Sequence, residues 1–236
     1  MTATNPAVKG VNLDELHQEA KKLVALLDDR QPGLMSWNQF MQERMQKLHA
    51  LTILGLGQEG VTQTVAKPGI IHIDRKKPFN PAEFIGNGWN FWRGPTDGNG
   101  LKGEIEQDSR SVALAEVDLS KVRFETCLLG PDRCTDGETS ITGEERIKRL
   151  IAAKRVRLDL GIFQMLWNNQ HLIPESWKEK TNGNTTLIFF DGQTLRFSRG
   201  GRCSLYLYWY DGKWYWSVGW HGRARDASRP SAVLES

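Results

Sequence analysis

Apolar residues recur at three- and four-residue spacing in two stretches near the start of the chain, a pattern that predicts two amphipathic helices. The first helix is expected to begin after Asn12, a candidate N-cap, and to end at the turn residues Pro32 and Gly33. The second is expected to begin at Ser36 and to complete an αα-hairpin over residues 1–55. Such a hairpin cannot bury both apolar stripes by itself, so we expect it to pack on the rest of the chain or on a partner.

Residues 56–69 are rich in glycine and poor in apolar side chains, which is the composition of a linker and marks a domain boundary. A second domain is therefore expected over residues 70–236. Its first part alternates between short apolar segments and polar turns. Four of these segments have the composition of strands: 70–74, 88–94, 111–119 and 121–129.

Two helices are predicted in the middle of this second domain. Thr142 opens the first, over residues 143–154, as the N-cap of a capping box. Its Glu, Lys and Arg residues alternate, which is typical of a solvent-exposed helix face. The second helix spans residues 161–172, with Asp159 as its cap, and ends before Pro174.

The C-terminal part contains two Asp-Gly pairs, Asp191-Gly192 and Asp211-Gly212, each flanked by strand-like runs. Asp-Gly favours the two-residue type I′ turn of a β-hairpin, because both residues tolerate the positive φ angles that this turn needs. Together with the helices, the pattern predicts an α+β fold. We expect it to end in a four-stranded antiparallel meander, with strands at about residues 185–190, 193–198, 203–210 and 213–220.

A two-residue turn at Asp211-Gly212 places Tyr210 opposite Lys213, and the two faces of this hairpin then differ in composition. The face with the composition of a core carries Leu205, Leu207, Trp209, Trp214, Trp216 and Val218. The opposite face has the composition of a half-solvated or contact surface and carries Tyr206, Tyr208, Tyr210, Lys213, Tyr215 and Ser217.

The connection before this hairpin decides which face Arg196 joins. One extra residue at Gly200-Gly201, a β-bulge, would place Leu195 and Phe197 with the tryptophans. The same bulge would place Arg196 beside the tyrosines. We prefer this register to a plain four-residue loop, which would place Phe197 on the tyrosine side.

The chain has 236 residues and a net charge of +3, and its basic excess lies around the aromatic hairpin. Residues 182–236 contain seven Lys and Arg against four Asp and Glu, whereas the preceding residues are balanced. Stacked aromatic rings beside basic side chains are how sheet-based modules hold single-stranded nucleic acid. We therefore expect the tyrosine face, with Arg196, Arg202 and His221, to bind nucleic acid or another polyanion, with a protein partner as the alternative.

Three cysteines, Cys127, Cys134 and Cys203, form no CxxC pair, which argues against a disulfide framework and a zinc ribbon. The first residues lack the basic-then-apolar order of a secretory signal, and no apolar run approaches the roughly 18 residues that span a bilayer. We expect a cytoplasmic protein with no membrane contact, no metal site and no cofactor.

No catalytic motif supports an enzyme. None of the five histidines has HExxH or HxH spacing, and neither a P-loop nor GxSxG occurs in a usable context. The segment from Asp97 to Asp108 matches a calcium loop at Asp97 and Asn99 but fails at Leu101, so a solvated loop is favoured.

Three classes of function stay open. The leading one is a non-enzymatic binding protein that uses the tyrosine and arginine face. The second is an enzyme of unknown class whose residues converge near His221 only in the folded protein. The third is a structural or assembly component that docks through the helical hairpin. The tyrosines can also serve the sheet alone, through cross-strand pairing or beneath the N-terminal helices.

Four segments of the second domain carry a resemblance: "IDRKKPFNPAEFIGNGWNFWRGP", "SITGEERIKRL", "FQMLWNNQHLIPESWK" and "RPSAVLES". They resemble a family of uncharacterised bacterial proteins, chiefly from candidate-phylum genomes, and "DRQPGLMSWNQFM" is similar to part of the same set. The resemblance covers residues 70–236. It implies a bacterial cytoplasmic origin and a single architectural unit from about residue 70 onward, and it implies no activity, cofactor or catalytic residue.

Overall fold

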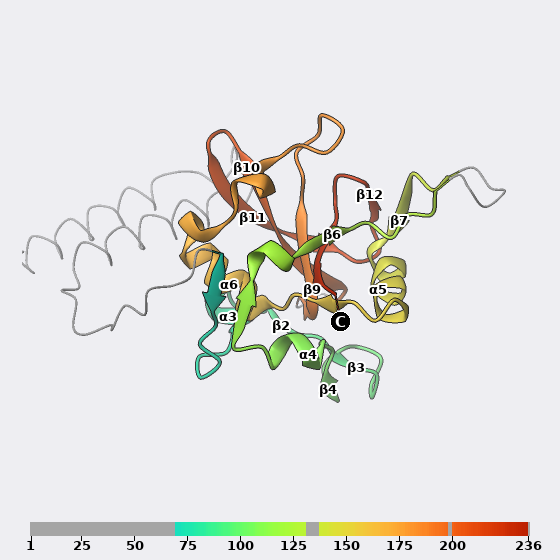
Figure 1. Cartoon of the computed structure of the whole chain (residues 1–236). Helices are drawn as coiled ribbons and strands as arrows, with labels where there is room; N and C mark the ends of the chain where they lie inside the picture. The colour runs from blue at the N-terminus through green and yellow to red at the C-terminus, as the bar shows by residue number, and fades with distance from the viewer. Residues whose placement is uncertain (1–68, 131–136, 198–199, 236) are drawn as a thin grey trace, which may run out of the picture. The chain divides into compact units, whose positions relative to one another are not determined.

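The computed structural model describes residues 69–130, 137–197 and 200–235 (Figure 1). The predicted αα-hairpin and all but the last residue of the predicted linker lie outside these residues. The described part is an α+β fold. In this part no helix has the length and apolar character that crossing a membrane requires. Its four α-helices are α3 Pro81–Phe84, α4 Ser109–Val112, α5 Gly143–Ala152 and α6 Leu160–Asn168.

A seven-stranded sheet forms the centre of this fold. Its main path runs in the order β11 (Lys213–Trp220), β10 (Arg202–Tyr210), β9 (Ile188–Arg196), β13 (Ser231–Leu234) and β6 (Arg123–Glu125). Two short strands complete it, β2 (Asn90–Phe91) against β9 and β8 (Val156–Arg157) against β13. All these pairs are antiparallel except β9 with β13.

Smaller elements surround the central sheet. Three two-stranded sheets pair β1 (Ile70–His72) with β5 (Glu116–Asp118), β7 (Ser140–Thr142) with β12 (Ala224–Asp226), and β3 (Arg93–Gly94) with β4 (Glu104–Ile105). The described residues also form the 3-10 helices η1 (Leu119–Lys121), η3 (Gln170–Leu172) and η4 (Glu175–Lys178).

Both predicted helix caps of the second domain are confirmed. The Thr142 hydroxyl accepts a hydrogen bond from the Glu145 amide at 3.2 Å, which begins α5. The Asp159 carboxylate accepts from the amides of Gly161 and Ile162 at 2.7 and 3.3 Å, which begins α6. The α6 helix is shorter than predicted, because it ends at Asn168 and a 3-10 turn follows.

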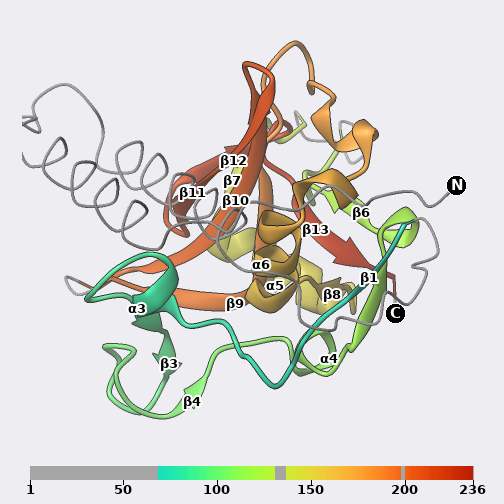
Figure 2. The same ribbon diagram turned by 90° about the vertical axis from the view of Figure 1, so that its left-hand side faces the viewer.

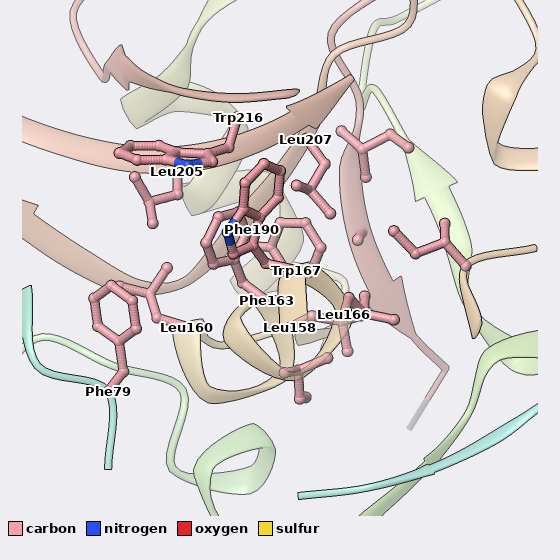
Figure 3. Close-up of a cluster of buried hydrophobic side chains, with 14 of the residues drawn as sticks. Phe79, Leu158, Leu160, Phe163, Leu166, Trp167, Phe190, Leu205, Leu207 and Trp216 are labelled. Carbon is pink, nitrogen blue, oxygen red and sulfur yellow. The ribbon is translucent and has the colours of Figure 1, made fainter. Parts of the chain in front are cut away.

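The helices α6 and α5 cover opposite faces of the sheet (Figures 1 and 2). Successive side chains of a strand point to opposite faces, so Phe190 and Phe189 of β9 separate. Phe190 meets Phe163 of α6 with ring centroids 5.3 Å apart, whereas Phe189 lies under Arg146 of α5. Figure 3 shows the α6 side as the main hydrophobic core, where Trp216, Leu205 and Leu207 pack above Phe163 and Trp167.

The predicted hairpin at Asp191-Gly192 is wrong, because β9 runs without a turn from Ile188 to Arg196. Opposite β10, Leu195 pairs with Cys203 and Phe190 pairs with Leu205. Four residues of β9 therefore face a single residue of β10, and the central sheet has a three-stranded meander where we expected four strands. The extra residues, 191–194, form a large bulge.

Tertiary contacts explain why Asp191-Gly192 does not turn. The bulge pairs with other segments: the Gly192 amide donates to the Leu158 carbonyl at 2.9 Å, and the Gly192 carbonyl accepts from the Asp108 amide at 2.7 Å. A Cβ atom on Gly192 would lie 2.3 Å from the Arg157 carbonyl oxygen. Gly192 is thus required for close approach of two backbones, and Asp191 is fully buried.

The hairpin at Asp211-Gly212 is confirmed, with φ angles of 48° and 75° at the two turn residues. Its register is the predicted one, with Tyr210 opposite Lys213 and Trp209 opposite Trp214. The tryptophan face packs in the core, where Trp214 and Trp216 are 2% and 3% exposed.

As predicted, Leu195 lies on the tryptophan face of the sheet, where it is buried in the core. The bulge that produces this outcome lies in β9, whereas Gly200 and Gly201 belong to the turn. Phe197 packs against Trp89, with ring centroids 4.9 Å apart, and Phe189 takes the place beside Tyr206.

One predicted strand is a helix followed by a strand. Residues 111–119 were expected to be extended, but Asp108 caps α4 by accepting a hydrogen bond from the Arg110 amide at 3.2 Å. The chain then forms β5 only from Glu116 to Asp118. The local cap overrides the loose apolar alternation.

Candidate functional site

Four aromatic rings form a row on the face of the sheet opposite the main core, and we call this row, Phe189, Tyr206, Tyr208 and Tyr215, the aromatic ladder. Neighbouring ring centroids lie 4.8, 5.8 and 5.4 Å apart, and the rings of Tyr208 and Tyr215 are stacked at 19°. All three tyrosines are half-buried. Burial raises the pKa of Tyr208, and the neighbouring Tyr206 and Tyr215 add to the effect.

The tip of the hairpin extends this row into solvent. Tyr210 is 61% exposed, and the Lys213 ammonium lies 5.2 Å from the centroid of the Tyr215 ring. The structure therefore brings together five of the predicted site residues: Tyr206, Tyr208, Tyr210, Tyr215 and Lys213.

The predicted arginines lie at the other end of β10. Arg202 pairs with Arg196 across the strands and forms an ion pair with Glu106. Arg196 donates from Nε to the Asn99 carbonyl at 2.6 Å, away from the ladder. The expectation that Arg196 lies beside the tyrosines does not hold, because Arg196 pairs with Arg202, four residues before Tyr206 on β10, and Phe189 is the residue opposite Tyr206.

His221 is fully buried, with Nε2 2.7 Å from the Ser204 hydroxyl. Burial lowers the pKa of His221 to about 3, although the nearby Asp191 carboxylate acts in the opposite direction. The imidazole is therefore neutral at physiological pH. Neither His221 nor Ser204 lines the arginine pocket or the larger cavity beside α6, both of which are described below and are formed by described residues.

A buried cluster of charge lies next to Phe189, and we call Asp191, Arg225, Arg146 and Ser231 the arginine cluster. Nη1 of Arg225 donates to both Asp191 oxygens at 3.0 Å, and Ser231 donates to the same carboxylate. Nη2 of Arg146 lies 3.7 Å from it. Burial alone would raise the pKa of Asp191, but the charges of Arg225 and Arg146 hold it well below its usual range.

A cavity of about 150 Å³ opens beside this cluster, and we call it the arginine pocket. Its walls combine aromatic rings with guanidinium groups, and its lining residues include Phe189, Tyr206, Trp220, Arg223, Arg225 and Arg229. Tyr206 and Phe189 belong to both the pocket and the aromatic ladder. The two features thus form one continuous surface.

A larger cavity of about 380 Å³ lies beside α6. Apolar side chains and amides line it, among them Phe79, Phe91, Met165, Gln107, Gln164 and Gln193. Its buried charge is already balanced, because Arg75 donates to both Asp159 oxygens at 2.9 and 3.0 Å and Ser111 donates to Asp159 at 2.7 Å. These contacts hold α6 against the loop that follows β1.

The arginine cluster was missed by sequence reasoning, which treated the α5 segment as an exposed face. The helix buries Gly143, Arg146, Ile147 and Leu150. This spacing is that of one helical stripe, so the position of Arg146 relative to Ile147 and Leu150 was a usable signal. Arg223, Arg225 and Arg229 contributed to the prediction only through the net charge of residues 182–236.

The last candidate sites considered in the sequence are the calcium-like loop, the cysteines and a metal site. Asp97 accepts hydrogen bonds from the amides of Asn99 and Leu101 at 2.9 and 3.4 Å, which closes its own loop. Burial raises the pKa of the Cys203 thiol to about 12. Within the described ranges, no three His, Cys, Asp or Glu residues are grouped so as to hold a metal ion.

Comparison with known proteins finds no match. No protein-family model, no curated protein and no solved structure matches the chain.

Proposed function

We propose that the protein binds single-stranded nucleic acid along the aromatic ladder. The observation that carries this proposal is the row of three half-buried tyrosine rings on a sheet face. Their neighbouring centroids lie 5.8 and 5.4 Å apart, and the rings of Tyr208 and Tyr215 are stacked. Bases stack on such rings without regard to sequence, and each stack contributes about 1–3 kcal/mol.

Cations flank the ladder at both ends, which supports a polyanionic ligand. Lys213 lies over Tyr215 at one end, and Arg223 and Arg229 line the pocket beside Tyr206 at the other. Basic side chains at these positions would meet the phosphates of a strand whose bases lie on the rings. Aromatic pairs that only stabilise a sheet require no such charges.

The alternative of an enzyme near His221 has less support. Its imidazole and the Ser204 hydroxyl are both fully buried, and the carboxylate that acts on its charge, Asp191, is held by Arg225. A general base must reach its substrate directly or through one water molecule. This geometry favours a structural role for the Ser204–His221 hydrogen bond.

The test is binding of a fluorescent single-stranded oligonucleotide to the full chain, followed by anisotropy. A triple variant, Tyr206→Leu, Tyr208→Leu and Tyr215→Leu, keeps apolar cover on the sheet but removes the rings. We expect it to weaken binding at least tenfold, because one or more base stacks are lost. Thermal unfolding of the variant shows whether it is folded.

Trp209→Leu is the matched control, because this half-buried ring also lies on β10 but packs against the main core on the opposite face of the sheet. It should change the affinity far less than the triple variant. Equal binding by the folded triple variant and the unaltered chain would reject the ladder as the binding surface.

A further inference from the structure

Next to Phe189, two buried arginines share a single buried carboxylate, so one positive charge is not balanced. Arg146 and Arg225 are 0% and 2% exposed, and they share one buried carboxylate, that of Asp191. Burial lowers the pKa of Arg146 to about 9, and the neighbouring Arg225 charge contributes to this shift. A buried cation without its own counter-ion is costly, so an anion at this place would stabilise the fold.

Several guanidinium nitrogens of this region also lack hydrogen-bond acceptors. Among the described residues, Nε and Nη2 of Arg225 and Nε of Arg229 are buried without such a partner, and both residues line the arginine pocket. Buried donors are almost always paired in folded proteins, and unpaired ones call for a missing acceptor. An oxyanion supplies several acceptor atoms at once.

Arg225 is held in place before any ligand binds. Its guanidinium lies 3.8 Å from the Phe189 ring centroid. It also packs against Gly143, where an added Cβ would come within 2.7 Å of Cζ. A planar fork fixed in this way loses little freedom when it binds an oxyanion.

The size and lining of the arginine pocket suit a small anionic ligand. Arg223, Arg225 and Arg229 line its volume of about 150 Å³, and none of the described residues that line it is acidic. Asp226 is the nearby carboxylate that feels the charge of Arg229, and it is engaged by the amide and hydroxyl of Ser228 at 2.9 and 2.6 Å. A cavity of about this volume accommodates a molecule as large as benzene, and hence a phosphate group.

We propose that the arginine pocket binds the phosphate group of a phosphomonoester. Three guanidinium groups around a small cavity match a tetrahedral dianion, and the aromatic ladder begins at the pocket wall with Tyr206. The nucleic-acid part of this inference rests on the proposed function: the phosphomonoester would be the terminal phosphate of a strand that lies along the ladder. The phosphate site itself stands on the arginines alone.

The first test is calorimetric titration of the full chain with inorganic phosphate. We expect saturable binding that sodium chloride at equal ionic strength does not reproduce. Arg223→Gln and Arg229→Gln should each weaken phosphate binding about tenfold, because each removes a charged hydrogen-bond donor. These side chains are less buried than Arg225, so the variants are expected to fold, and thermal unfolding checks this.

Arg93→Gln is the control for charge, since Arg93 is exposed and lies on β3, away from the pocket. It should leave phosphate binding unchanged. Absence of saturable phosphate binding, or equal weakening by all three substitutions, would overturn the phosphate site.

The second test compares one oligonucleotide with a terminal phosphate or a terminal hydroxyl. Tighter binding of the phosphorylated strand, lost in Arg229→Gln, supports the terminal phosphate as ligand. Phosphate binding without oligonucleotide binding would support the pocket and reject the ladder. Oligonucleotide binding that depends on the tyrosines but not on the terminal phosphate, with no binding of inorganic phosphate, would reject the pocket and retain the ladder.

Discussion

Nη1 of Arg225 donates to both carboxylate oxygens of Asp191 at 3.0 Å, and neither residue is more than 2% exposed. This contact joins β12 to the bulge of β9, two segments 34 residues apart in the chain. Removing both charges from water costs several kcal/mol per ion, which only close geometry and further hydrogen bonds can offset. The pair therefore makes the fold dependent on each partner.

Asp191→Asn should strongly destabilise the protein. The substitution keeps the shape of the side chain but leaves Arg146 and Arg225 buried without a counter-ion, and breaking such a pair costs about 3–5 kcal/mol. Urea unfolding measures the loss. Asp211→Asn is the matched control in the other Asp-Gly pair, where Asn-Gly suits the same turn and little change is expected. Similar stability of the two variants would contradict a structural role for the buried carboxylate.

Gly192→Ala and Gly212→Ala should both destabilise the protein, but by different amounts and for different physical reasons. A Cβ on Gly192 would meet the Arg157 carbonyl oxygen at 2.3 Å and the Leu158 carbonyl carbon at 2.6 Å, so two backbones must separate. We expect a loss of about 3 kcal/mol or more in the free energy of unfolding. Gly212 has open space around it and only a positive φ of 75°, which costs about 1–2 kcal/mol. A larger loss at Gly212 would show that the close approach at Gly192 is not required.

Stability should fall as the pH is lowered below about 6.5, the ordinary pKa of histidine. Burial lowers the pKa of His221 to about 3, so between these values the unfolded chain binds a proton that the folded chain does not. The free energy of unfolding therefore decreases through this window as acidity rises. Urea unfolding at several pH values between about 7 and 5 measures the slope. His221→Gln should flatten it, and an unchanged slope in the folded variant would exclude His221 as its source.

Oligonucleotide binding should weaken as salt rises, and Lys213→Gln should reduce that dependence. A lysine that contacts one phosphate contributes about one to the slope of log affinity against log salt concentration. Anisotropy titrations at several salt concentrations measure this slope for the variant and the unaltered chain. Arg93→Gln, at a site away from the ladder, should leave the slope unchanged. The same slope in all three proteins would place Lys213 outside the binding surface.

Local interactions explain which elements could be predicted from the sequence. Thr142 and Asp159 cap helices through backbone amides two or three residues away. The turn at Asp211-Gly212 depends on two backbone angles and on the strands beside it. That turn alone sets the separation of tryptophans from tyrosines, because side chains of paired strands alternate between faces.

Long-range contacts decided the rest. The two Asp-Gly pairs have the same backbone preferences, yet only one forms a turn. Asp191 pairs with Arg225, and the Gly192 backbone forms hydrogen bonds with neighbouring segments. Arg146 lies in a helix whose charges suggest an exposed face, and the fold buries it over Phe189.

The sequence by itself thus determined the capped helices, the second hairpin and the tyrosine face of the predicted site. Only the tertiary structure decided that Arg196 and Arg202 lie away from the tyrosines and that Arg223, Arg225 and Arg229 surround a pocket beside them. The physical reason is that a residue's neighbours in sequence set its backbone angles, whereas burial and charge pairing depend on segments that meet only after folding.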